Sequence, residues 1–136
     1  MAGMSTAQRR LTEAEYLTAE RLAETKSDYY DGEALPLSGS NRMRSLIAGA
    51  ILAALAEQLR ARPDEVYGNM RVKVGDTRLI TYPSLVVVSN KPHFFDDEDD
   101  TLLNPTVLVE VLSDSTANYV RTLKVSEKSR WAEARL

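Results

Sequence analysis

Apolar residues recur at helical spacing most clearly between residues 41 and 60. Side chains at i, i+3, i+4 and i+7 form one stripe there: Met43, Leu46, Ile47, Ala50, Ile51, Ala54, Leu55 and Leu59. Ser40 or Asn41 can cap the start of this helix, and Pro63 closes it soon after Arg60. We expect the helix to bury its apolar stripe.

A second helix is predicted over residues 12–25. Thr12 is followed three residues later by Glu15, which is the signature of a capping box. The stretch "SDYYDGEALPL" then indicates a β-hairpin that turns at Asp31-Gly32 and places Pro36 on an edge strand.

Three further stretches have the composition of strands. "EVYGNMRVKV" alternates apolar and polar residues, "LITYPSLVVVSN" enters an apolar run through a proline, and "PTVLVEVLS" is apolar apart from one carboxylate. The turn "GDTRL" joins the first two, so we expect them to be antiparallel neighbours.

The segment after residue 113 is predicted to be a last helix that continues to the end of the chain. Ser115 or Thr116 can cap it, and its stripe comprises Val120, Leu123 and Trp131. The order of elements indicates one α/β or α+β domain over residues 1–136 with one mixed sheet, and residues 1–10 as a flexible tail.

Composition narrows the possible functions. The 136 residues include no cysteine and one histidine, which argues against thiolate and histidine-rich metal sites. No apolar run is long enough for a membrane span or a signal peptide, so we expect a cytoplasmic protein. The net charge of −3 gives no overall attraction to nucleic acid. The acids at 96–100 indicate a solvated loop, since they lack the glycine and last glutamate of an EF-hand.

Two residues interrupt the apolar strands. Glu110 lies within "VLVEVL", where a central strand would remove much of its hydration and require a partner, a metal or a shifted pKa. A strand with one exposed face is the alternative. Ser84 lies at the entrance of the other strand, as a structural residue or as a weak ligand acting through water. Lys124 follows Glu110 on the last predicted helix, where it is either solvated or folded back toward the strand end.

These stretches carry a resemblance to a known family. "LTEAEYL", "SDYYDGE", "ITYPSLVVVSN", "DDTLLNPTVLVEVLSDST" and "NYVRTLK" resemble the Uma-two family of restriction endonucleases, a branch of the PD-(D/E)XK nuclease superfamily. The resemblance covers roughly residues 11–125. It implies a restriction-endonuclease-like mixed sheet flanked by helices, and hydrolysis of DNA phosphodiester bonds that depends on Mg²⁺.

The resemblance also implies roles for individual residues. Glu110 corresponds to the family's metal-binding glutamate and Lys124 to a helix lysine that replaces the usual strand lysine. The family's first aspartate falls on Ser84, so activity is expected to be weak or absent. Asp28 stands where the family usually has a glutamate.

The resemblance also predicts how the site and the edge of the sheet are arranged. Ser84 and Glu110 should lie on adjacent strands and face the same surface. The last strand or strands of the family's sheet should be missing, which would leave an edge open for a homodimer or for pairing with an intact relative. A non-catalytic module is the alternative, either for subunit interaction or for nucleic-acid binding through Arg42, Arg44, Arg71 and Lys73.

Overall fold

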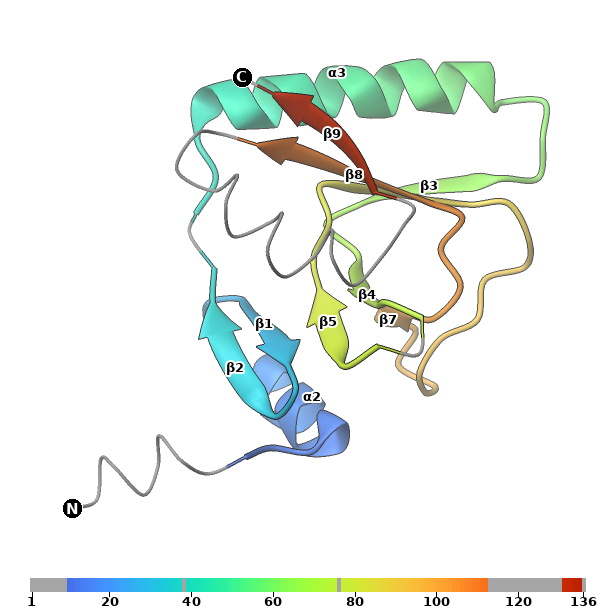
Figure 1. The fold of residues 1–136 in the computed structure, drawn as a ribbon. Helices are drawn as coiled ribbons and strands as arrows, with labels where there is room; N and C mark the ends of the chain where they lie inside the picture. Colours follow the sequence, from blue (N-terminus) through green and yellow to red (C-terminus); the bar gives the residue numbers. More distant parts are fainter. Residues whose placement is uncertain (1–9, 38, 76, 113–130, 136) are drawn as a thin grey trace.

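The computed structural model describes residues 10–37, 39–75, 77–112 and 131–135 (Figure 1). The first predicted helix is α2 (Glu13–Leu22). Its capping box is complete: the Thr12 hydroxyl accepts from the backbone of Glu15, and the Glu15 carboxylate accepts from the backbone of Thr12. The predicted start is therefore confirmed, and the helix ends at Leu22 rather than at residue 25.

The predicted hairpin is strands β1 (Ser27–Tyr30) and β2 (Glu33–Pro36), which pair antiparallel around Asp31-Gly32. Both turn residues have positive φ, 48° and 96°, a conformation that aspartate tolerates and glycine adopts freely. Strand β2 lies at the edge of a five-stranded sheet with the order β2-β1-β5-β4-β7. The expectation of Pro36 on an edge strand is confirmed.

A second sheet has four strands in the order β3-β6-β8-β9. The α+β class expected from the sequence is confirmed, but the strands form two mixed sheets rather than the one mixed sheet that was expected. Each sheet combines antiparallel pairs with one parallel pair, β4 with β7 in the first and β8 with β9 in the second.

The division into two sheets arises because two predicted strands each split. Residues 65–74 form β3 (Glu65–Gly68) and β4 (Arg71–Lys73), separated at Asn69, whose φ is 61°. Residues 79–90 form β5 (Leu79–Thr81) and β6 (Leu85–Val88), separated at Pro83, which cannot donate a ladder hydrogen bond. The predicted antiparallel pairing holds in both halves, β3 with β6 and β4 with β5.

The main core lies between these strands. Its buried side chains are Val72, Val74, Leu79, Val86, Val88, Leu102 and Leu108. A smaller cluster packs α2 on the first sheet and comprises Tyr16, Leu17, Tyr29 and Ile80.

The second predicted helix is α3 (Arg42–Gln58), which Asn41 caps by accepting from the backbone of Arg44. It lies along the four-stranded sheet and contacts β3 and β8. The expectation that it buries its apolar stripe is wrong. None of its residues is fully buried, and Met43 and Leu46 are 50% and 53% exposed. Part of the reason is that one side of the helix borders a cleft.

Strand β8 (Val107–Leu112) confirms the third predicted strand. Strand β9 (Trp131–Arg135) overturns two expectations. Residues 131–135 are a strand rather than the end of a helix, and they pair in parallel with Leu108–Leu112, so the edge expected to be open beside β8 is covered. The predicted cap and the residues Val120 and Leu123 lie outside the described residues.

The stretch "NKPHFFDDEDDTLLNP" (90–105), whose acids predicted a loop, contains a short strand, β7 (Thr101–Leu102), at the edge of the five-stranded sheet. In the described part of the chain, no helix has the length and apolar character needed to cross a membrane.

Candidate active site

Ser84 and Glu110 form a hydrogen-bonded pair across two neighbouring strands. The backbone N–H and the hydroxyl of Ser84 both donate to Glu110 Oε1, each at 3.2 Å. The Ser84 hydroxyl in turn accepts from the backbone N–H of Val111 at 3.0 Å. The strand register explains this contact, because β6 and β8 pair antiparallel through Leu85 and Val109, which places Ser84 opposite Glu110. The predicted adjacency is confirmed.

Glu110 occupies a position that is unusual for a carboxylate. Its exposed fraction is 4%, and Leu108, Val109, Val111 and Leu112 around it are buried as well. The alternative of a strand with one exposed face is therefore wrong. A buried carboxylate needs hydrogen bonds or a cation to offset its lost hydration. Ser84 supplies two of those hydrogen bonds.

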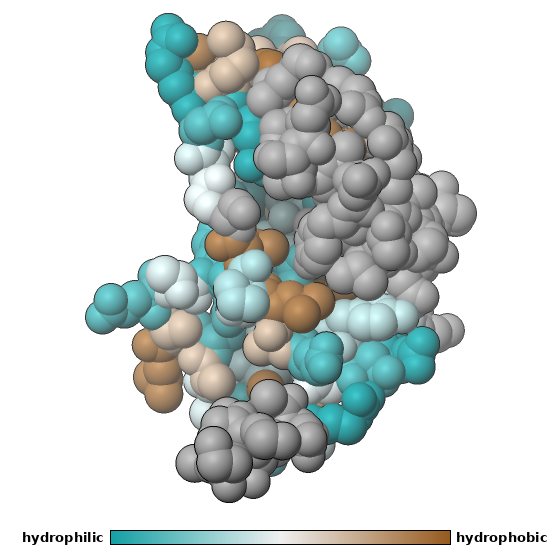
Figure 2. All heavy atoms as spheres, turned by 60° about the vertical axis from the view of Figure 1, so that its left-hand side comes forward, coloured by the Kyte–Doolittle hydropathy of each residue, from teal (hydrophilic) through white to brown (hydrophobic). Residues whose placement is uncertain are grey.

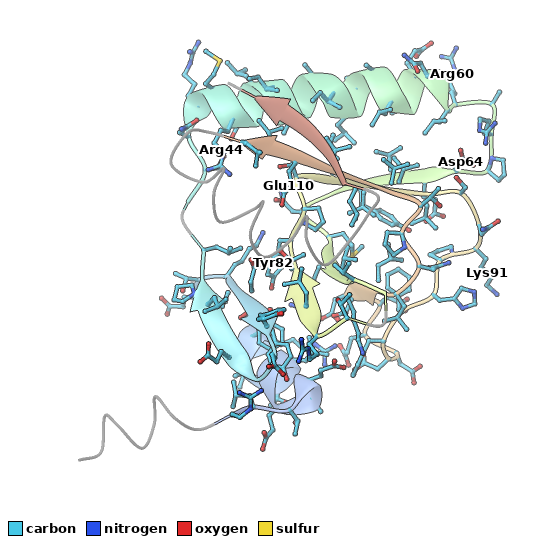
Figure 3. The ribbon with its side chains drawn as sticks, viewed as in Figure 1. Arg44, Arg60, Asp64, Tyr82, Lys91 and Glu110 are labelled. Atoms are coloured by element: carbon cyan, nitrogen blue, oxygen red, sulfur yellow. The ribbon has the colours of Figure 1, made fainter. Side chains whose placement is uncertain are left out.

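The Ser84–Glu110 pair lies in the wall of a cleft with a volume of about 840 Å³. Figure 2 shows a hollow on this face of the molecule, between the α3 end and the hairpin end. In Figure 3, Glu110, Arg44 and Tyr82 lie around the space between α3 and the first sheet. The lining combines the connection between α2 and β1, the end of β2, the start of α3, the β3–β4 bend and the strand ends at the pair. Its described polar and charged residues are Thr25, Lys26, Ser40, Arg44, Ser45, Asn69, Tyr82, Ser84 and Glu110.

Asp28 is not among the described residues that line this cleft. It is fully buried in β1, where it accepts a hydrogen bond of 2.8 Å from the Thr81 hydroxyl of β5. The structure thus places Asp28 in the interior of the first sheet, beside Thr81. Lys124 lies outside the described residues.

The four predicted nucleic-acid-binding cations separate into two groups. Arg44 lines the cleft, and Arg42 is exposed beside it at the start of α3. Arg71 is only 7% exposed and forms an ion pair with Asp100, while Lys73 forms an ion pair with Glu13. Arg71 and Lys73 are thus already paired with acids, whereas nucleic-acid binding by the four cations stays a prediction.

Comparisons with known proteins identify the family and a solved structure with the same fold. A family model named Uma2 and described as "Putative restriction endonuclease" matches residues 13–129. The chain belongs to the Uma2 family. This is the Uma-two family of the sequence resemblance, and the match includes the Ser84–Glu110 pair and Lys124.

One curated protein and one solved structure are similar to this Uma2 protein. It is 30% identical over 115 residues to "Uncharacterized protein sll1609" of Synechocystis, covering 84% of this chain and 65% of that relative's length. A crystal structure of "a putative nuclease belonging to DUF820" from Anabaena variabilis shares the fold with a TM-score of 0.69. That match covers 92% of this chain and 74% of the other at 15% identity.

Tyr82, which lines the cleft, belongs to a network of charged and phenolic groups. Tyr82 precedes Pro83 and Ser84; its hydroxyl donates to Glu20 at 2.5 Å and accepts from Arg71 at 3.0 Å. Burial raises the pKa of Tyr82 to about 12, and the bond to Glu20 adds to this effect. The phenol therefore stays protonated near neutral pH and can hold both contacts.

Arg71 connects Tyr82 to the 96–100 loop through an ion pair with Asp100. Its Nε donates to Thr101 at 2.9 Å, and its Nη2 lies 2.7 Å from Asp100 Oδ2, although without hydrogen-bond alignment. Arg21 binds the same carboxylate at 2.7 and 2.8 Å and reaches Asp96 at 3.0 Å. The solvated loop expected from the sequence is thus bound by ion pairs to α2 and β4. No local pattern near residues 96–100 indicated these partners.

Acid should weaken this network. The hydrogen bonds from Arg21, together with the nearby Arg71 charge, hold the pKa of Asp100 well below its usual range. A depressed pKa contributes stability above the unfolded-state value of about 3.9, and that contribution is lost as pH falls through the folded-state value. We expect the stability difference between wild type and Asp100→Asn, measured by urea unfolding, to be constant from pH 7 to about 5 and to shrink below about 4. A difference that grows on acidification would contradict this assignment.

The residues at the pair fit a magnesium ion only weakly. Magnesium binds through one or two carboxylates together with waters and substrate phosphates. Ser84 and Glu110 offer one carboxylate and one hydroxyl, and the described residues include no group of three or more histidine, cysteine or acidic side chains.

Proposed function

We propose that this Uma2 protein binds DNA in the cleft and hydrolyses its phosphodiester bonds slowly, with magnesium held at Glu110. The observation that supports this function is the buried Glu110 carboxylate in the cleft wall, bonded to the residue at the family's aspartate position. A carboxylate buried in a cleft wall has lost hydration that hydrogen bonds or a bound cation must offset, which makes it a candidate functional group.

Each residue at the pair has a separate part in this proposal. Glu110 would hold magnesium, which when bound polarises a phosphate oxygen and activates water. Lys124 would stabilise negative charge as the reaction proceeds, by resemblance to the family's helix lysine. Ser84 keeps Glu110 in place through the two hydrogen bonds from its backbone and hydroxyl.

The rate is expected to be low because Ser84 is neutral. A hydroxyl is a weaker ligand for a hard cation than a carboxylate. In addition, both hydrogen bonds from Ser84 go to Glu110 Oε1, so they compete with a metal ion for that oxygen.

Nicking of DNA tests this function. Purified wild type, incubated with supercoiled plasmid or circular single-stranded DNA, should cleave slowly with magnesium and not with EDTA. Glu110→Gln keeps the shape of the side chain and removes its charge, so cleavage should fall to the level without protein. Cleavage that persists in Glu110→Gln would place the activity elsewhere in the molecule.

A non-catalytic nucleic-acid-binding protein is the second candidate. The observation that favours it is that the described part of the site offers one carboxylate where magnesium-dependent sites commonly have two. Binding of DNA by wild type without any magnesium-dependent cleavage would select this candidate.

A further inference from the structure

The cations that line the cleft differ from most cations of the described chain. Most of the others are paired with carboxylates: Arg10, Arg21, Arg60, Arg62, Arg71, Lys73 and Arg78. Among the residues whose side chains are described, four cations pair with no carboxylate, Lys26, Arg42, Arg44 and Lys91, and two of them, Lys26 and Arg44, line the cleft. They are the only described cations of the lining, and Glu110 is its only described acid. The described part of the lining therefore carries more positive than negative charge, in a chain whose net charge is −3.

The position of Lys26 is fixed by its neighbour. Its ammonium lies 5.1 Å from the centre of the Tyr82 ring, within the range of a cation–π contact. The hydrogen bonds from Tyr82 to Glu20 and from Arg71 to Tyr82 hold that ring in place. Since Tyr82 leads directly into Pro83 and Ser84, Lys26 is positioned on the same wall as the Ser84–Glu110 pair.

Arg44 approaches the cleft from another element. It lies in the first turn of α3, whose start is fixed by the Asn41 cap, and Ser40 and Ser45 line the cleft beside it. Lys26 belongs to the connection between α2 and β1. Two cations on separate elements can contact different phosphates of one polyanion.

We propose that Lys26 and Arg44 bind the phosphodiester backbone of a single nucleic-acid strand that lies in the cleft against the Ser84–Glu110 pair. This inference rests on the proposed function and specifies its substrate. The apolar part of the lining includes Leu37, Leu52, Pro83 and Leu85, which suit the flat faces of unpaired bases.

The size of the cleft favours a single strand over a duplex. A volume of about 840 Å³ falls in the range of pockets that enclose a small molecule. A duplex is larger than such a pocket, since its major groove alone is about 12 Å wide. The bases of a duplex are also stacked inside it, so their faces cannot contact the cleft wall. A duplex would remain outside, whereas a few unpaired nucleotides can enter.

The test is fluorescence anisotropy with a labelled oligothymidine strand and a duplex of the same length, in EDTA so that no cleavage occurs. Each phosphate contact lowers log K by roughly 0.7 per decade of salt for single strands. Lys26→Gln and Arg44→Gln should each reduce the salt slope by about 0.7 and weaken binding about fivefold near 0.1 M salt. The duplex should bind more weakly than the single strand.

Two matched variants serve as controls. Lys91→Gln removes an exposed cation outside the cleft lining, and Arg60→Gln removes an arginine beyond the far end of α3 (Figure 3). Both should bind as wild type does. The salt slope separates a lost phosphate contact from misfolding, because partial unfolding lowers the active fraction and leaves the slope unchanged.

The outcomes separate this inference from the proposed function. Wild-type affinity and slope in Lys26→Gln and Arg44→Gln, with wild type still binding and cleaving DNA, would overturn the inference alone. Tighter binding of the duplex would overturn the assignment to single strands. Wild type that binds neither nucleic acid would overturn the proposed function and the inference together.

Discussion

Replacing Ser84 by aspartate should increase the rate of magnesium-dependent DNA nicking by about 100-fold. The new carboxylate would lie opposite Glu110, where the Ser84 hydroxyl now lies 3.2 Å from Glu110 Oε1. Its oxygens could accept from the Val111 N–H as the hydroxyl does now. A second hard anionic ligand restores the charge that a divalent ion requires, and a single electrostatic contact in an active site typically contributes 10²–10³ in rate. Initial rates on plasmid DNA give the ratio.

Two further variants show whether charge causes the increase. Ser84→Asn has nearly the shape of Ser84→Asp without the negative charge, so its rate should not exceed that of wild type. Adding Glu110→Gln to Ser84→Asp should abolish the gain, because the two carboxylates act on one ion. An equal increase in Ser84→Asn would show that a change in shape, rather than a metal ligand, is responsible.

Removing the Asp100 carboxylate should cost about 3 kcal/mol of stability at neutral pH. The Asp100→Ala variant leaves the Arg71 guanidinium without its carboxylate, and that side chain is only 8% exposed. Breaking a buried ion pair by removing one partner typically costs 3–5 kcal/mol. We take the lower end because the Asp100 side chain is 36% exposed and water can reach it. Urea unfolding followed by circular dichroism measures the loss.

Asp97→Ala is the matched control for this variant. Asp97 is exposed on the same loop and forms no hydrogen bond or ion pair with the described residues, so its loss should change stability by less than about 0.5 kcal/mol. Equal effects of the two variants would mean that the loop contributes through its overall negative charge rather than through the Arg71 and Arg21 contacts.

Local patterns in the sequence predicted the elements that depend on neighbouring residues. The capping box at Thr12, the Asp31-Gly32 turn and the Asn41 cap are short-range hydrogen-bond and dihedral effects, and each is present. The Ser84–Glu110 pairing was predictable because both residues interrupt apolar strands and match two positions of one family motif.

Features that depend on distant contacts could not be predicted in this way. The ion pair between Arg71 and Asp100 joins residues far apart in the sequence. Local pattern therefore gave no reason to expect Arg71 to be buried and paired. Residues 131–135 follow a helical pattern, yet pairing with β8 makes them a strand, which shows tertiary context overriding local preference. Lys26 carried no signal of its own, because its role in the cleft depends on the position of Tyr82.

Glu110 is proposed to bind a metal ion at a site that lacks a second acid. The most direct test is to titrate wild type, Ser84→Asp and Glu110→Gln with magnesium by calorimetry, without nucleic acid. We predict weak binding by wild type, at least tenfold tighter binding by Ser84→Asp, and no binding at this site in Glu110→Gln. Equal magnesium affinity in wild type and Ser84→Asp, or binding that survives in Glu110→Gln, would contradict it.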